Sequence, residues 1–387
     1  MGALRVFLVA GEPSGDALGA ALMAGLKHLR PEVDFAGIGG PLMEAQGMSS
    51  RFDMSELSLM GIAEVLPKYF HLKRRISETA EAVIAQQPDV LITIDSPDFC
   101  LRVAKSVKAG SDIRTVHYVA PTVWAWRPGR AKKMAQMIDH VLALFPFEPP
   151  FMEAEGMACD FVGHPAANAP RATSEETKAF RAAHGLSDAD PLILVLPGSR
   201  RGEVARMGPV FGEVLCAMAA ARPNMHMIVP AAPAVADAVQ ALVQDWPVDA
   251  HIVDIRGMDG DTAQATKRAA FAAADVALAT SGTVALELAA AGTPMVSAFD
   301  LNWLSRIIIP RLLITDTTCL VNLVTESHVV PELIGFDFKA DNVRKAMEEL
   351  LADPSVQADA MERTMDLLGR GGEDPGLRAA RAVLDRL

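Results

Sequence analysis

Compact apolar runs alternate with amphipathic segments along almost the whole chain. The first run, Arg5 to Ala10, leads into a glycine-rich turn and then into a helix-like pattern from Ala17 to Leu29. The further apolar runs that we predict to be strands are 90–94, 115–119, 191–196, 225–229, 275–279 and 294–298. Runs that are apolar throughout are typical of parallel strands buried on both faces. The pattern therefore predicts an α/β protein.

Two halves of this kind follow one another along the chain. Between them, Gly163 to Thr173 is rich in Ala, Pro and Asn and has no periodicity, as in an interdomain linker. A length of 387 residues also exceeds what one hydrophobic core usually serves. We predict two Rossmann-like domains, 1–168 and 169–365, facing each other across a cleft that holds the site. For the C-terminal helix, 366–387, packing back on the N-terminal domain is one arrangement left open.

Composition excludes several classes of protein. A net charge of −12 argues against binding to nucleic acid. Met1 to Ala10 lacks the pattern of a signal peptide. The most apolar long stretch, Ala269 to Gly292, contains Asp275 and Glu287, and we read it as helix, strand and helix rather than a membrane span. Widely spaced cysteines favour a reducing cytosol over a disulfide or zinc framework; they are Cys100, Cys159, Cys216 and Cys319.

The strand ending at Leu196 runs directly into a polar loop, Pro197 to Glu203. Gly198 lets the backbone come close to a ligand, and the Arg200 guanidinium can grip two phosphate oxygens at once. The loop therefore suits a diphosphate. An ordinary polar turn between strand and helix is an equally good interpretation of this motif alone.

A second anion site is indicated by Thr280 to Thr283, which follows a strand and opens the helix Val284 to Ala291. Its hydroxyls and the helix dipole both favour phosphate, although simple helix capping would need only one hydroxyl. Glu287 lies about one turn into this otherwise apolar helix and could accept both hydroxyls of a ribose; a solvent-facing Glu is the alternative. With the Pro197 to Glu203 loop, this element predicts a nucleotide-diphosphate pocket at the carboxyl ends of parallel strands.

Two motifs in the first half follow predicted strands. Gly11 to Asp16 departs from GxGxxG, but it suits a sugar or an acceptor phosphate at a helix N-terminus, with a structural turn equally open. Asp95 and Asp98 follow a fully apolar strand, and one of them could be a general base while the other caps the next helix. Simple capping by either carboxylate is the competing interpretation.

Further segments allow two interpretations each. Pro121 to Arg130 combines two tryptophans with two arginines, which suits a sugar face and a phosphate but also core packing. His117 and His164 could assist there, although a lone His near a strand end is usually structural. Leu57 to Arg75 mixes large apolar side chains with a basic end, as in a segment at an anionic membrane surface or in a core helix with a charged tip. Asn302 to Leu313 is a second, weaker candidate for membrane contact.

The sequence predicts no metal site. Asp259-Gly260-Asp261 matches the DxD motif of metal-dependent glycosyltransferases, but its neighbours are typical of a surface turn leading into a helix. No cluster of His or Cys offers a better site.

Several strings of residues resemble the lipid-A-disaccharide synthase family in nearly unbroken order over essentially the whole chain. They are AGEPSGDALGA, LMGIAEVLP, DSPDF, APTVWAWRPGR, VGHP, LPGSRRGE, TSGTVALELAAAGTPMV and VNLV. The resemblance implies a GT-B fold, related to glycosyltransferase family 19, and a peripheral location on the cytoplasmic face of the bacterial inner membrane. It implies an inverting transfer from UDP-2,3-diacylglucosamine to 2,3-diacylglucosamine 1-phosphate (lipid X), giving a β-1,6-linked disaccharide 1-phosphate and UDP. No cofactor is implied, and a homodimer is left open.

The resemblance also implies roles for single residues. Asp98 matches the family's essential acidic residue and is our candidate base, and Arg200 matches the arginine that binds the diphosphate. Asn322 matches the asparagine that closes the nucleotide pocket, but Val321 stands where the family often has proline, which leaves that role open. We assign to the donor Ser199, Arg200, Ser281, Gly282, Thr283, Glu287 and Asn322, and to the acceptor side Ser14, Gly15 and Asp16.

Three other functions share parts of this pattern. Two are enzymes, the GT-B peptidoglycan N-acetylglucosaminyltransferase and a UDP-GlcNAc epimerase, and both would have the nucleotide pocket without the DSPDF and WAWRPGR strings. The third is a nucleotide-sugar or lipid-binding protein without catalysis.

Overall fold

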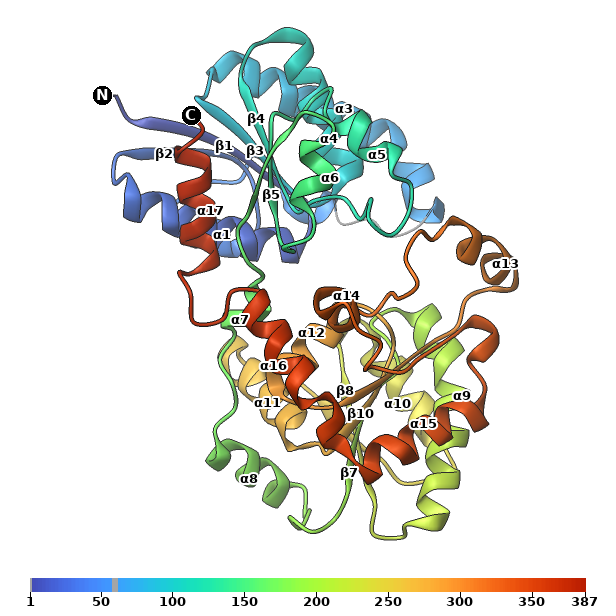
Figure 1. Ribbon diagram of the computed structural model, residues 1–387. Coiled ribbons are helices and arrows are strands. Elements are labelled where there is room, and N and C mark those ends of the chain that lie inside the picture. The colour runs from blue at the N-terminus through green and yellow to red at the C-terminus, as the bar shows by residue number, and fades with distance from the viewer. Residues whose placement is uncertain (1, 58–61) are drawn as a thin grey trace. The chain divides into compact units, whose positions relative to one another are not determined.

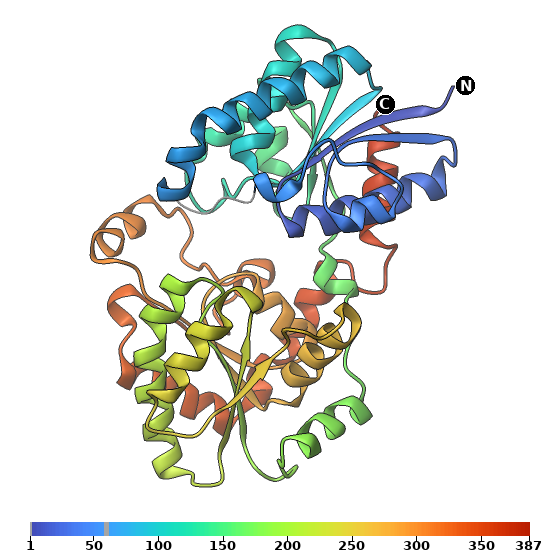
Figure 2. The ribbon, with the colours of Figure 1, turned by 180° about the vertical axis from the view of Figure 1, so that it is seen from behind.

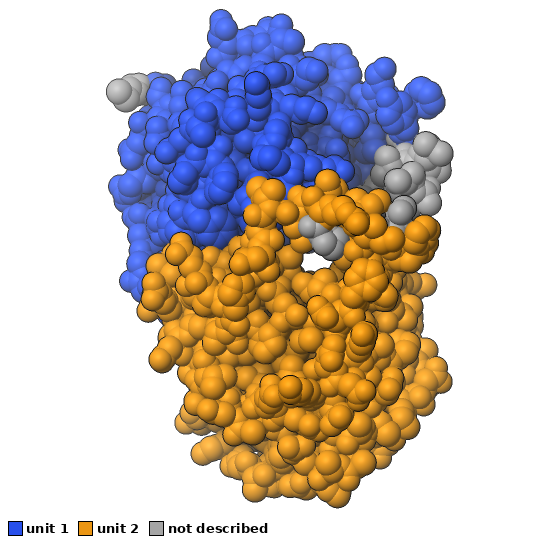
Figure 3. Space-filling model, turned by 45° about the vertical axis from the view of Figure 1, so that its right-hand side comes forward, with its two compact units in different colours: residues 1–168, 368–387 blue, residues 169–367 orange. Residues whose placement is uncertain are grey.

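The computed structural model describes residues 2–57 and 62–387, which fold into two compact α/β units. The first unit contains residues 1–168 together with 368–387, and the second contains 169–367 (Figure 3). The chain therefore passes from the first unit to the second and returns to the first at its C-terminal end.

The first unit is built on a parallel six-stranded sheet in the order β2-β1-β3-β4-β5-β6 (Figure 1). Its strands are β1 Leu4–Ala10, β2 Val33–Ile38, β3 Val90–Ile94, β4 Arg114–Tyr118, β5 His140–Ala143 and β6 Ala158–Phe161. In the register of the sheet, Val6 of β1 lies between Phe35 of β2 and Val90 of β3. All residues of β3 are buried, because helices cover both faces of the sheet.

Helices cover the first sheet in two layers. The helices of the first unit are α1 Pro13–Leu29, α2 Pro41–Ala45, α3 Ile62–Gln86, α4 Pro97–Gly110, α5 Gly129–Met134, α6 Pro149–Glu153, α7 Pro165–Asn168 and α17 Pro375–Leu384. Helices α3 to α6 supply the apolar core on one face. On the other face α1 and the C-terminal α17 lie side by side (Figures 1 and 2). Gly376 permits this contact, because a Cβ there would lie 2.5 Å from the carbonyl oxygen of Ala21.

The second unit repeats the plan with a six-stranded parallel sheet in the order β12-β11-β10-β7-β8-β9. Its strands are β7 Leu192–Leu196, β8 His226–Ala231, β9 His251–Asp254, β10 Val276–Ala279, β11 Met295–Phe299 and β12 Glu332–Ile334. Its helices are α8 Ser174–Ala183, α9 Arg201–Ala221, α10 Ala236–Gln244, α11 Gly260–Ala273, α12 Val284–Ala291, α13 Trp303–Leu312, α14 Leu320–Thr325, α15 Ala340–Ala352 and α16 Ala358–Leu367. Helices α9, α10 and α15 pack on one face, and α8, α11, α12, α14 and α16 belong to the other (Figure 1).

The α/β prediction is confirmed by these two parallel sheets. The stretch from Ala269 to Gly292 contains the end of α11, strand β10 and helix α12, as the sequence predicts. Among the described residues, one helix, α9, is long and apolar enough to cross a membrane by length and composition. Its apolar side chains belong to the second core, where Met207, Phe211 and Leu215 are fully buried.

Candidate functional site

A cavity of about 710 Å³ opens in the second unit at the carboxyl ends of β7, β8, β9 and β10. Strand β7 pairs with β8 on one side and with β10 on the other, so the chain order reverses there. Open α/β sheets place ligands at such a switch point. The cavity is lined by the loop after β7, the loop and helix after β10, one face of α11 and an apolar wall; the lining includes Gly198, Ser199, Arg200, Glu203, Pro230, Pro233, Val253, Ile255, Lys267, Phe271, Ser281, Gly282, Thr283 and Glu287.

The loop after β7 already holds an anion, the carboxylate of Glu203. This carboxylate accepts hydrogen bonds from the main-chain N–H groups of Ser199 (3.0 Å) and Arg200 (3.2 Å), and it pairs with the Arg200 guanidinium at 3.1 Å. Gly198 is required because its φ is 126° and a Cβ there would lie 2.5 Å from the Cβ of Glu203. The Arg200 side chain stays 66% exposed and is the part of the loop that remains open to a ligand.

The loop after β10 presents hydroxyls that do not cap the helix behind it. Thr283 is the N-cap of α12, and no side-chain hydrogen bond caps this helix. Gly282 has a φ of 149°, which favours glycine. The hydroxyl of Ser281 lies 3.4 Å from that of Thr318. Among the described contacts, the hydroxyls of Thr280 to Thr283 therefore do not act as helix caps. Both loops predicted to bind phosphate line the same cavity.

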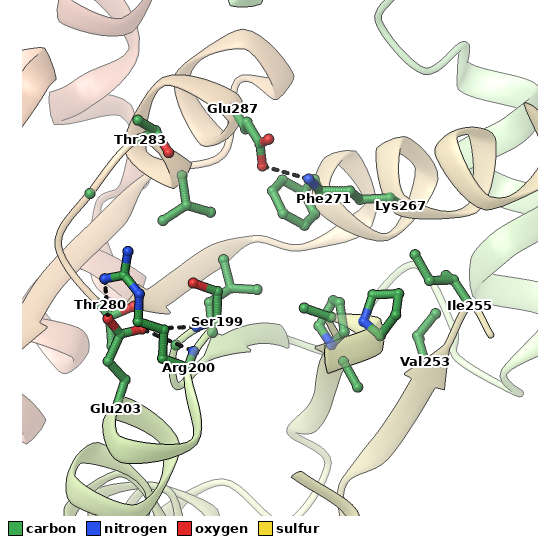
Figure 4. Close-up of a pocket in the computed structure, with 18 of the residues that line it drawn as sticks. Ser199, Arg200, Glu203, Val253, Ile255, Lys267, Phe271, Thr280, Thr283 and Glu287 are labelled. Carbon is green, nitrogen blue, oxygen red and sulfur yellow. Dashed lines mark hydrogen bonds and ion pairs between the residues drawn. The ribbon is translucent and has the colours of Figure 1, made fainter. Parts of the chain in front are cut away.

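Glu287 lines the same cavity and pairs with a lysine that the sequence analysis did not single out. Its carboxylate lies 2.8 Å from Nζ of Lys267, which comes from α11 (Figure 4). The same ammonium lies 5.4 Å from the ring centroid of Phe271. The Glu287 side chain is 44% exposed, so its carboxylate stands at the cavity rather than in an apolar core. No periodicity or motif marks Lys267, because its role depends on the packing of α11 against α12.

Asn322 is not among the residues that line the cavity, and its role in closing the nucleotide pocket stays a prediction. The side chain is buried, its Oδ1 accepts from the N–H of Val330 at 3.0 Å, and its Nδ2 donates to the Val330 carbonyl at 2.9 Å. These two bonds hold the loop after α14. Val321 lies in the first turn of α14, a position that also accepts proline, so the departure from the family pattern leaves this backbone helical.

In the first unit, two predicted motifs meet at the carboxyl edge of the sheet. The Ser14 hydroxyl, after β1, lies 3.4 Å from Oδ2 of Asp95, after β3. Asp95 and Ser96 both have a positive φ, 50° and 42°, which is strained for residues with a side chain. Strain of this kind gathers at functional sites. Gly11 leaves the room that this turn needs, because a Cβ there would lie 2.7 Å from Oγ of Ser96.

Asp98 is the second residue of α4, and its side chain is exposed. The N-cap of α4 is Ser96, and no side-chain hydrogen bond caps this helix. Asp95 instead accepts from the adjacent N–H of Ser96 at 2.9 Å. Neither carboxylate therefore caps α4 in the way that the competing interpretation required, and Asp98 has no hydrogen-bond partner within residues 2–57 and 62–387.

Asp16 has a structural role in the first unit, and its assignment to the acceptor side stays a prediction. Its buried carboxylate accepts from the N–H groups of Gly40 (2.9 Å), Leu42 (3.0 Å) and Met43 (3.0 Å), so it ties α1 to the start of α2. Gly15 is buried as well, with the Ile94 carbonyl 3.3 Å from where its Cβ would lie. Of the three residues assigned to the acceptor side, Ser14 alone is exposed.

In the tryptophan-rich loop, Pro121 to Arg130, some side chains pack against the unit and others are exposed. Trp124 donates its indole N–H to the buried carboxylate of Glu148 at 3.3 Å, and burial raises the pKa of Glu148 to about 7. The ring of Trp126 carries the guanidinium groups of Arg127 and Arg130 at 4.3 and 5.0 Å from its centroid. Trp124 therefore anchors the loop, while Arg127 and Arg130, next to the half-buried Trp126, are its exposed part.

His117 and His164 are structural. His117 is buried against the hydroxyl of Thr93 at 2.8 Å, and Nδ1 of His164 accepts from the N–H of Ala166 at 3.1 Å. Burial lowers the pKa of each imidazole to about 4, so both are neutral near pH 7.

The remaining motifs have local roles. Asp259 caps α11 by accepting from the N–H of Thr262 at 3.0 Å, as expected of a turn leading into a helix. Part of the Leu57 to Arg75 segment, 58–61, lies outside the described residues. In the rest, Arg75 pairs with Glu56 at 2.9 Å.

Chains similar to this one are found over its full length. Residues 6–375 match the family described as Lipid-A-disaccharide synthetase. The Lipid-A-disaccharide synthase of Ruegeria pomeroyi is 61% identical over 384 residues, which cover 99% of this chain and 96% of that protein. That of Rhodospirillum centenum is 44% identical over 387 residues, 99% of this chain and 94% of that protein.

Solved structures share the fold at low sequence identity. The UDP-GlcNAc 2-epimerase from Neisseria meningitidis bound to UDP-GlcNAc has a TM-score of 0.64 at 13% identity, with 99% of both chains covered. MurG of Acinetobacter baumannii has a TM-score of 0.56 at 12% identity, covering 99% of this chain and 100% of that one. The two α/β units therefore form a GT-B fold.

Proposed function

Because the chain belongs to the lipid-A-disaccharide synthase family, whose members are UDP-sugar-dependent glycosyltransferases of lipid A biosynthesis, we propose how its two units share the reaction. The second unit binds the UDP part of the donor. The first unit supplies the base, Asp98, which takes the proton from the acceptor hydroxyl.

The cavity at the β7–β10 switch point is the observation that carries this proposal. Its volume of about 710 Å³ is in the range of small-molecule sites, roughly 300–1,000 Å³. Its wall at Val253, Ile255 and Phe271 suits the flat uracil ring, and its polar rim at Arg200 and Glu287 suits diphosphate and ribose. The Neisseria epimerase, which has the same fold, binds UDP-GlcNAc.

The chemistry needs one displacement. The acceptor hydroxyl oxygen bonds to the anomeric carbon from the face opposite the leaving group, the bond from that carbon to the diphosphate oxygen breaks, and UDP departs with the electron pair. Asp98 receives the hydroxyl proton, and the Arg200 guanidinium stabilises the charge that develops on UDP. A single step of this kind inverts the configuration at the anomeric carbon. Asp98 suits the base role because its carboxylate is exposed and has no partner among the described residues.

The donor that we propose is UDP-2,3-diacylglucosamine and the acceptor is 2,3-diacylglucosamine 1-phosphate. The test is mass analysis of the product formed when both are mixed with the full chain, with UDP release followed in parallel. The expected product is a tetra-acyl disaccharide 1-phosphate with one UDP released per bond. UDP release without disaccharide would indicate a hydrolase or an epimerase-like activity, and binding without UDP release would indicate a non-catalytic protein.

We further propose peripheral contact with the anionic inner face of the bacterial inner membrane. Two exposed apolar sites support this. Phe70 in the Leu57 to Arg75 segment is 82% exposed, and Trp303 at the start of α13 is 74% exposed. Phe70→Ser and Trp303→Ser should each reduce sedimentation with phosphatidylglycerol vesicles, while the control Val356→Ser, at a residue 54% exposed, should not. The proposal would be contradicted if all three variants sedimented with the vesicles as much as the native chain does.

A further inference from the structure

A chain of hydrogen bonds leads from the second-unit cavity to a carboxylate on β12. Ser281 lines the cavity, and its Oγ lies 3.4 Å from Oγ1 of Thr318, which is longer than the usual O–H···O hydrogen bond of about 2.5–3.0 Å. Oγ1 of Thr318 lies 2.7 Å from Oε1 of Glu332, which also accepts from the N–H of Thr318 at 3.0 Å. Thr318 and Glu332 stand behind the cavity and do not line it.

The number of protons that each group can donate determines the direction of these hydrogen bonds. A carboxylate only accepts hydrogen bonds, so the Thr318 hydroxyl gives its one proton to Glu332. The oxygen of that hydroxyl can then serve Ser281 only as an acceptor. Ser281 must therefore donate its own proton to Thr318, and its Oγ presents lone pairs rather than a proton to the cavity.

Glu332 is held firmly in this accepting role. The Thr317 hydroxyl donates to Oε2, and Nδ2 of Asn322 lies 3.4 Å from the same oxygen. With the two bonds from Thr318, hydrogen-bond donors face both oxygens of Glu332. The amide of Asn322 is itself oriented by its two bonds to Val330. The direction of this hydrogen-bond chain is thus set by the contacts that Thr317 and Thr318, which precede α14, make with Glu332 of β12.

We propose that Glu332 is a positioning residue of the donor site, which acts through Thr318 to hold the Ser281 hydroxyl as a hydrogen-bond acceptor. Ser281 then receives a hydroxyl or an amide N–H of the donor sugar nucleotide. The diphosphate oxygens only accept, so they are left to Arg200 and to main-chain N–H groups. This inference rests on the proposed binding of the UDP-sugar in this cavity, and it changes the role that the sequence suggested for the Ser281 hydroxyl.

The test uses the pair Thr318→Val and Thr318→Ser in the full chain. Valine keeps the shape of threonine without its hydroxyl, so Ser281 loses the group to which it donates, whereas serine keeps that group. We expect Thr318→Val to raise the Kd for UDP-2,3-diacylglucosamine and the KM for this donor about fivefold, the size of one neutral hydrogen bond. The KM for the lipid acceptor should stay unchanged, and Thr318→Ser should bind the donor as the native chain does.

Glu332→Gln adds a second measurement, because an amide can donate to Thr318 and so reverse the chain. It should raise the donor Kd as Thr318→Val does, and the double variant should be no weaker than either single one, since both act through the same bonds. Three results would each overturn the proposal. They are an unchanged donor Kd in Thr318→Val, losses of donor affinity that add in the double variant, and a variant with a lower Tm but native donor affinity. Failure of the native chain to form disaccharide would instead refute the proposed reaction, and titration with the donor would still decide the role of Glu332.

Discussion

The carboxyl edges of the two sheets are built from similar loops but carry charge differently. In the second unit each charged group at the cavity has a partner, with Arg200 on Glu203 and Lys267 on Glu287. In the first unit Asp98 is exposed and has no partner among the described residues, next to a turn with two strained residues, Asp95 and Ser96. Paired charges can be exchanged for those of a ligand, which suits binding. A carboxylate without a partner can take a proton, which suits chemistry.

The largest effect that we predict from this difference is the loss of turnover in Asp98→Ala. Removing a general base costs about 10²- to 10⁴-fold in kcat. UDP binding should stay native, because Asp98 belongs to the first unit. Steady-state kinetics and calorimetric titration with UDP measure the two properties separately, and Asp112→Asn, at an exposed aspartate of the same unit, is the control. Equal turnover in Asp98→Ala and the native chain would refute the base assignment.

Asp16→Ala should destabilise the first unit and spare the second. The substitution leaves the buried N–H groups of Gly40 and Met43, and the partly buried one of Leu42, without their acceptor, at a cost of about 3 kcal/mol or more. Hydrogen exchange followed by mass spectrometry should show faster exchange in α1 and β2 and native exchange in β7 to β10. Equal loss of protection from exchange in both units would contradict the prediction that Asp16 stabilises the first unit alone.

Arg200→Ala should weaken UDP binding and turnover together. The guanidinium is the exposed cation of the loop after β7, and losing a charge-assisted bond costs about 2 kcal/mol, or about 30-fold in kcat/KM. Arg201→Ala is the matched control, since Arg201 is exposed next to it but does not line the cavity. Equal losses in both variants would show that the local positive charge matters rather than the contact made by Arg200.

The smallest predicted effect concerns pH. Burial lowers the pKa of His117, His140 and His164 to about 4, so the unfolded chain binds more protons between pH 4 and 6.5 and the first unit loses stability as the pH falls through this window. Glu148, with a pKa raised to about 7, opposes this trend, because it gains stability as the pH falls from 7 toward 4.5. Relative to pH 7, the free energy of unfolding of the first unit near pH 5.5 should be lower by about 1 to 2 kcal/mol.

Glu148→Gln should steepen this loss by removing the opposing group. Denaturant unfolding followed by hydrogen exchange in each unit between pH 5 and 7 measures both slopes. A first unit whose stability does not change over this range would contradict the account of the buried imidazoles.

The apolar strands in the interior of each sheet were predictable from the sequence, and the strands at the sheet edges were not. Strands β1, β3, β4, β7, β8, β10 and β11 lie where the apolar runs predict them. The strands that no run marked are β2, β5, β6, β9 and β12; four of them lie at a sheet edge, and β5 lies next to one. The edge strands are partly exposed, so polar residues interrupt the apolar runs by which the interior strands are recognised.

The contacts of two predicted site residues depend on strands that the sequence pattern did not predict. Asp16 was assigned to a ligand because the turn after β2, which binds its carboxylate, was not predicted. Asn322 was assigned to the pocket because its bonds to Val330, just before β12, depend on that strand. Gly198, Arg200, Ser281 and Glu287 line one cavity because they follow adjacent central strands whose carboxyl ends meet at one edge of the sheet. Lys267 and Glu332 act through contacts between elements distant in the chain, which local patterns do not encode.

Hydrogen exchange of the full chain with and without saturating UDP tests the central claim, that the second-unit cavity binds the nucleotide. The account predicts that UDP slows exchange in the peptides covering 197–203 and 280–287, and that the peptide covering 95–100 exchanges as in the free protein. Slower exchange at 95–100 with no change at 197–203 and 280–287 would contradict it.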